Sequence, residues 1–222
     1  MFLQILTFAE KKFRNHHSLH IFQKGVTYME LRINVNRVGA LLEYICSLMP
    51  HIHLRKLLKV VYLVDEKSVK LRAIPLTWLD YYAWEKGPVA PLVYDVKNGE
   101  FSDYVICTKE ADGKWHVSPV KTTRYSIDQD MKVFSEYEMD IINSVVAHCE
   151  SKSADDLTDE THQDNSLWSK TVALNNINFD KSGRSNYIVN LNDLNDVDGK
   201  EIYADALDSV IMQAAINSAQ NV

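Results

Sequence analysis

Apolar residues recur at intervals of three and four positions over residues 36–49, and again over residues 54–66. This spacing places them on one face of an α-helix, so both segments are predicted to be amphipathic helices that bury that face in a core. Pro50 directly follows the first segment and fits its end. The basic residues of the second segment are expected to lie toward solvent: Arg55, Lys56 and Lys59. The chain must therefore supply a core large enough to cover two helices.

The segment after these two helices is also predicted to be largely helical. Residues 76–86 are predicted to form a third helix, which the Gly87 and Pro88 pair ends. Pro91 fits the first turn of a short helix that runs to Asn98, with a glycine following as its stop.

A hairpin and a series of capped helices are predicted for the second half of the chain. Residues 103–108 and 115–120 flank an Asp-Gly pair, which is typical of a hairpin turn. Ser135 and Glu138 have the spacing of a capping box. Further elements are expected to begin at Ser153 and Ser166 (helices), at residues 187–189 (a short strand) and at residues 198–201 (the last helix). The expected fold is α+β and mainly α-helical, a compact helical domain with a small β-hairpin or short sheet.

The chain is expected to divide into three parts. Residues 1–28 lack periodicity, and we interpret them either as an extension that precedes a true start at Met29 or as an amphipathic arm on the body. Residues 29–175 are expected to form the domain. Residues 176–222 are expected to form a C-terminal segment whose final helix packs on that domain, and which either completes it or supplies partner specificity.

Composition indicates an ordinary globular chain, with 46% hydrophobic and 24% charged residues in 222. Three widely spaced cysteines suit free thiols, and no apolar run approaches the length of a membrane span, so we expect a cytoplasmic protein without membrane contact. Residues 1–75 hold 12 Lys+Arg and 5 Asp+Glu, whereas residues 76–222 hold 12 and 25. The basic part is expected either to bind nucleic acid or an acidic partner, or to pair with the acidic part.

Motifs for catalysis and cofactor binding are absent from the sequence. There is no phosphate-binding loop, dinucleotide fingerprint, H-E-x-x-H, Cys-x-x-Cys or Gly-x-Ser-x-Gly. His51 and His53 are two residues apart and no third ligand is evident beside them, so a surface or helix-start role is favoured over metal binding. We therefore expect no enzyme, no catalytic residue, no cofactor and no metal.

Aromatic residues are concentrated around a Gly-Pro-x-x-Pro corner. Five of them fall within 17 residues: Trp78, Tyr81, Tyr82, Trp84 and Tyr94. The corner at residues 87–91 gives these rings fixed positions at low entropic cost. Two interpretations remain open, a recognition surface and a small core packed around a tight corner.

Two ordered blocks of sequence resemble a known family. Residues 54–62 with 83–94 form the first, and the second runs from residues 134–135 to residues 153–168, ending in a Thr-His pair and a Trp. Together they are similar to the Panacea domain, also called the SocA-like or phage-associated GepA-like domain, over about residues 36–175. Lys86 departs from the aromatic residue common at that position.

The resemblance implies a mainly helical antitoxin of a bacterial or phage toxin-antitoxin pair, which neutralises a cognate toxin by direct protein contact. Two alternatives are a proteolytic adaptor that delivers the toxin to a Clp-type protease, and a nucleic-acid-binding regulator, against which an overall pI near 5.7 counts. The toxin is expected to be encoded in the adjacent gene. The candidate partner-binding residues are Tyr62, Trp84, Tyr94, His162 and Trp168, with Arg55 and Lys59. Residues assigned to a structural role in the corner are Gly87, Pro88, Val89 and Pro91.

Overall fold

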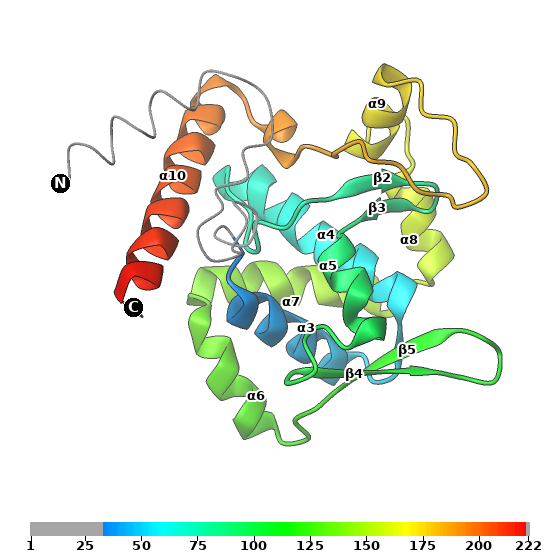
Figure 1. Cartoon of the computed structure of the whole chain (residues 1–222), viewed down its shortest axis with the longest axis vertical. Helices are drawn as coiled ribbons and strands as arrows, with labels where there is room; N and C mark the ends of the chain where they lie inside the picture. Colours follow the sequence, from blue (N-terminus) through cyan, green and yellow to red (C-terminus); the bar gives the residue numbers. More distant parts are fainter. Residues whose placement is uncertain (1–32, 221–222) are drawn as a thin grey trace.

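The computed structural model describes residues 33–220, which are coloured in Figure 1. The predicted extension at residues 1–28 and the predicted start at Met29 lie outside the described residues. Among the residues that are described, no helix combines the length and the apolar character needed to cross a bilayer.

Helix α4 (Leu54–Arg72) runs through the centre of the molecule (Figure 1). Its first turn is capped by His53, whose side chain accepts a hydrogen bond from the Arg55 amide, so the predicted helix-start role is confirmed. The helices packed against it include α3 (Val35–Leu48), α7 (Glu136–Glu150) and α8 (Ala154–Thr161). Both predicted amphipathic helices are therefore present, and α4 continues to Arg72.

Two small antiparallel sheets lie beside these helices. The first has the strand order β1 (Ile52–His53), β5 (Trp115–Pro119), β4 (Val105–Lys109). The second pairs β2 (Tyr82–Trp84) with β3 (Gly87–Val89). The predicted hairpin is confirmed as β4 and β5, and the expectation of a mainly helical α+β fold is confirmed with it.

The predicted helix at residues 76–86 is wrong. The amides of Leu76 and Thr77 donate to the carboxylate of Asp65 instead of starting a helix. Trp78 then adopts a left-handed backbone with φ of 59°, and β2 follows. A buried acceptor distant in sequence thus overrides the local helical pattern.

The remaining helices begin largely where their caps predict. Ser135 and Glu138 form the capping box of α7, Ser153 caps α8, and Ser166 caps α9 (Leu167–Leu174). The other elements are α5 (Pro91–Tyr94), the 3-10 turn η1 (Asp95–Asn98), α6 (Arg124–Asp130), η2 (Met131–Val133), η3 (Leu191–Leu194) and α10 (Val197–Gln220). The strand expected at residues 187–189 is reduced to one bridge between Tyr82 and Ile188. Helix α10 contacts the body where Tyr203 packs edge-on against Trp78 at 5.0 Å.

Glu138 joins three elements as well as capping α7. One carboxylate oxygen accepts from Arg37 at 2.6 Å and from Arg72 at 2.7 Å, and the other accepts from the Ser135 amide at 3.0 Å. Burial opposes ionisation here, but the hydrogen bonds from Arg37, Ser135 and Arg72 outweigh it and lower the pKa of Glu138 to about 2. The carboxylate therefore ties the starts of α3 and α7 to the end of α4.

Replacing Glu138 by glutamine is expected to destabilise the protein by about 2 to 4 kcal/mol, because both arginines lose their common counter-charge. The native pKa of Glu138 lies below the ordinary 4.5, so this stabilisation is complete above pH 4.5 and is lost as the pH falls toward 2. Urea unfolding at pH 7 and at pH 3 measures both effects. The exposed Glu136→Gln change is the control, and an equal loss in the two variants would contradict the assignment.

Candidate partner-binding surface

The corner between β3 and α5 is formed by glycine and proline residues that suit its tight backbone conformation. Gly87 has φ of 101°, and a Cβ there would lie 1.9 Å from the Lys59 ammonium nitrogen and 2.8 Å from the Thr161 hydroxyl. Pro88 and Val89 complete β3, and Pro91 occupies the first turn of α5. In Figure 1 the β2–β3 pair lies between α4 and α9, with α5 beside it. This framework orients the aromatic side chains of β2 and α5.

Four aromatic rings from three regions of the chain form a row at this corner. Trp84 of β2 packs edge-on against Tyr94 of α5, with ring centroids 5.1 Å apart. The indole of Trp168, on α9, donates to the Trp84 carbonyl at 2.8 Å. Phe179 stacks on Trp168 with centroids 6.0 Å apart and planes 7° apart. Three of the predicted contact residues are therefore brought together.

Arg184 covers the outer side of this row. Its guanidinium carbon lies 4.6 Å from the Trp84 ring centroid and 5.3 Å from that of Tyr94. The Arg184 side chain is exposed, and Lys97 approaches the Tyr94 ring to 3.8 Å. Hydrogen bonding by Lys97, and less by Arg184, lowers the pKa of the Tyr94 phenol, although burial opposes this. The corner is thus a layered cation-aromatic surface.

A segment far away in the sequence holds Arg184 in place. The Gly183 carbonyl accepts from the Glu85 amide at 2.7 Å, and the Ser185 hydroxyl donates to the Ala83 carbonyl at 2.6 Å. The Ala83 amide donates to the Tyr187 carbonyl at 2.9 Å. Residues 183–187 therefore run along β2. Sequence reasoning missed Arg184 and Phe179, because nothing local in their neighbourhood indicates this pairing.

His162 packs beneath the row rather than joining its outer side. Its ring centroid lies 3.6 Å from that of Trp168, and its Nε2 atom is buried without a hydrogen-bond partner in the described part of the chain. Burial, with the nearby charge of Lys59, lowers the pKa of His162 to about 4. The imidazole is therefore neutral near pH 7.

Two of the predicted contact residues lie in the core rather than at the surface. Tyr62 is 1% exposed, packs edge-on against Tyr81 and donates its hydroxyl to Glu66. Lys59 is also 1% exposed, and its ammonium donates to the Lys86 carbonyl and to the Thr161 hydroxyl. Lys59 was expected to face solvent, but β3 and α8 cover α4 on that side.

Four other basic residues of α4 have partners within the molecule. Arg55 forms an ion pair with Asp155 at 2.7 Å, and Arg72 pairs with Glu138 at 2.7 Å. Lys56 donates to the Glu150 carbonyl at 2.9 Å, and Lys70 pairs with Glu66 at 2.9 Å. Of the two interpretations of the charge asymmetry, pairing with the acidic half accounts for Arg55 and Arg72.

A family model for the antitoxin SocA-like Panacea domain matches residues 57–169. The chain belongs to this family. The matched range includes Trp84, Tyr94, His162 and Trp168, and it ends before Phe179 and Arg184. No curated protein and no solved structure matches the chain. The family name indicates an antitoxin role, and the predicted resemblance is confirmed.

Proposed function

We propose that this protein is the antitoxin of a toxin-antitoxin pair and neutralises its cognate toxin by binding it directly, in the cytoplasm. The contact is assigned to the aromatic-arginine surface, which we define as Trp84, Tyr94, Trp168 and Arg184. The single observation that carries the assignment is the exposed Arg184 guanidinium layered over Trp84 and Tyr94. Trp, Tyr and Arg are the residues that most often dominate binding energy at protein interfaces.

The surroundings of this surface have the polar character of an interface rim. A hollow next to Arg184 is lined partly by amide side chains, namely Asn175, Asn176, Asn178 and Asn186. Such groups supply hydrogen-bond donors and acceptors around a desolvated aromatic centre. Because Arg184 is already held against two rings, little side-chain entropy would be lost on binding. Binding of this kind requires no catalytic residue and no cofactor.

The resemblance to the Panacea family implies that different members bind different toxins. The position of the surface fits this expectation. Trp84 and Tyr94 lie inside the residues that match the family model, whereas Arg184 and the asparagine-lined hollow lie outside it. We therefore assign the framework of the surface to the matched domain and partner choice to residues 175–187, in line with the specificity role that the sequence left open for the C-terminal segment.

Co-expression with the product of the adjacent gene tests this function. We expect growth rescue, a co-purified complex, and an affinity about 10- to 100-fold lower for Arg184→Ala with an unchanged melting temperature. The matched control is Arg124→Ala, because Arg124 is likewise exposed and lies 5.1 Å from the ring of Tyr44. Equal affinities of wild type and Arg184→Ala would remove the surface assignment, and a harmless neighbouring product would remove the toxin assignment.

The same experiment distinguishes the two alternatives. Rescue that depends on a Clp-type protease and lowers the amount of toxin would assign the adaptor role. DNA binding with a steep dependence on salt concentration would assign a regulator instead, because phosphate contacts release counterions.

A further inference from the structure

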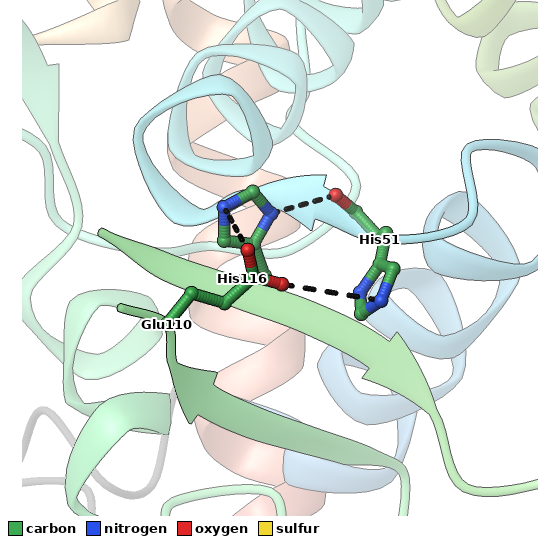
Figure 2. A group of neighbouring side chains, drawn as sticks. All are labelled: His51, Glu110 and His116. Carbon is green, nitrogen blue, oxygen red and sulfur yellow. Dashed lines mark hydrogen bonds and ion pairs between the residues drawn. The ribbon is translucent and has the colours of Figure 1, made fainter. Parts of the chain in front are cut away.

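Three side chains converge beside the turn of the β4–β5 hairpin, and His51 is distant in sequence from the other two (Figure 2). His51 lies in the turn between α3 and β1, His116 lies on β5, and Glu110 follows the last residue of β4. One candidate ligand atom from each lies within 4.8 Å of those of the other two. The cluster arises because β1 and β4 both pair with β5, which places His116 between them.

Both imidazoles approach the Glu110 carboxylate with their Nε2 atoms. Nε2 of His51 lies 4.0 Å from one oxygen of Glu110, and Nε2 of His116 lies 3.7 Å from the other. Nδ1 of His116 lies 3.0 Å from the His51 carbonyl oxygen, which can only accept a hydrogen bond. Nδ1 must therefore carry the hydrogen in this contact. In the neutral imidazole the lone pair is then on Nε2, the atom of His116 that faces Glu110 in Figure 2.

We propose that His51, Glu110 and His116 form a binding site for a divalent transition-metal ion of the zinc type. Two imidazoles and a carboxylate are ligands that suit such ions better than Mg²⁺ or Ca²⁺. Tetrahedral ligands about 2.1 Å from a zinc ion lie roughly 3.4 Å from one another. One candidate atom from each of the three residues already lies within 4.8 Å of the other two, so small side-chain movements would bring them to this spacing. A carbonyl that orients a ligating imidazole through its other nitrogen is a recurrent feature of metal sites.

A second histidine-glutamate pair shows what an ordinary contact looks like in this protein. Nε2 of His148 lies 3.0 Å from both oxygens of Glu160, and the Lys152 ammonium lies 2.6 Å from one of those oxygens. That pair is in hydrogen-bond contact, so an ion cannot lie between its members. The spacings at Glu110 are longer by 0.7 Å or more, and His51 and Glu110 are exposed enough to adjust.

The same geometry explains why no third ligand was evident beside His51 and His53 in the sequence. His53 lies opposite His116 in the sheet, but its Nδ1 atom accepts from the Arg55 amide to cap α4. The usable pair is thus His51 with His116, which are 65 residues apart. No sequence spacing within residues 51–53 could indicate it.

A bound ion would join the α3–β1 turn to the hairpin and leave a fourth position for water or for a partner's donor. This proposal is independent of the proposed function, because the hairpin lies apart from the β2–β3 pair that carries the aromatic-arginine surface (Figure 1). Binding to the native state alone would also raise the melting temperature as the metal concentration rises.

The test is titration of the full chain with Zn²⁺ in competition with a chromophoric chelator. His16, His17 and His20 are changed to glutamine in every sample, since these residues can also bind the ion. We expect 1:1 binding in this background and an affinity at least about 10-fold lower for Glu110→Gln and for His116→Gln. The matched control, His148→Gln, should bind zinc as its parent does.

A second readout is the visible spectrum of the Co²⁺ form, which reports the coordination of the ion. We expect an absorption band that disappears in Glu110→Gln and remains in His148→Gln. Melting temperatures without metal identify any variant that fails to fold. Glu110 is exposed, so Glu110→Gln is expected to fold normally and to report on metal binding alone. Equal zinc affinity in the parent and Glu110→Gln, or no binding by the parent, would overturn the proposal.

Discussion

Replacing Asp65 by alanine is expected to lower the free energy of unfolding by about 3 to 5 kcal/mol. The carboxylate is fully buried and accepts four hydrogen bonds. The donors are the Leu76 amide at 2.7 Å, the Thr77 amide at 3.0 Å, the Tyr81 hydroxyl at 2.8 Å, and the Thr77 hydroxyl. Alanine would leave all four buried donors without this acceptor.

Denaturant unfolding at pH 7 measures this loss. Asp65→Asn is expected to cost less than alanine, because the amide oxygen keeps one acceptor while the amide nitrogen cannot accept. Asp164→Ala, at an exposed position, is the control and should stay within about 0.5 kcal/mol of wild type. A loss below about 1 kcal/mol for Asp65→Ala would show that the segment from Leu76 to Tyr81 finds other hydrogen-bond partners.

Asp65 also shows where prediction of the fold from sequence ends. Helix starts at Ser135, Ser153 and Ser166 were predicted correctly because an N-cap signal lies within four residues of the structure that it forms. The β4–β5 hairpin was also predicted correctly, because its Asp-Gly signal lies between the two strands that it joins. Residues 76–86 carry a helical pattern too, but their first amides are taken by a carboxylate on another helix. No pattern inside residues 76–86 contains that information.

The burial of Lys59 and Tyr62 was missed for a different reason. A helical pattern shows which face is most apolar, but whether the opposite face meets water depends on the number of elements packed around the helix. Helix α4 contacts elements on several sides, so both residues are buried. The long aliphatic stem of Lys59 fits this environment, while its charged end needs the acceptors that the β2–β3 turn and α8 provide.

The candidate surface was predictable in part. Trp84 and Tyr94 were identified from aromatic density, and Trp168 from the resemblance to the Panacea domain. Arg184 and the cluster of His51, Glu110 and His116 depend on pairings between segments 65 to 100 residues apart. Those pairings are set by the burial of the whole chain, and the family match ends before Arg184. Sequence reasoning therefore recovered the framework of the surface but not the cation that covers it.

Lys59 provides the second large effect. Reversing the charge of an exposed lysine would change stability little, whereas Lys59 is buried. Lys59→Glu is expected to destabilise the protein by about 3 to 5 kcal/mol or to prevent folding, because it buries a carboxylate against the Lys86 carbonyl. Lys59→Met keeps the length of the side chain and removes the charge, so it should be far less harmful. The exposed Lys132→Glu change is the control for charge reversal. Equal stability of wild type and Lys59→Glu would contradict burial of this side chain.

The pH dependence of stability separates the charge of Lys59 from its packing. Burial, with a smaller effect of Arg55, lowers the pKa of Lys59 from 10.5 to about 7. Between these two values the unfolded chain binds a proton that the native chain does not, so stability rises with pH and the full cost of the buried charge is present below pH 7. Relative to Lys59→Met, wild type should gain about 1.5 kcal/mol between pH 7 and pH 8.5, measured by urea unfolding. A flat difference over this interval would mean that Lys59 keeps its proton in the native state.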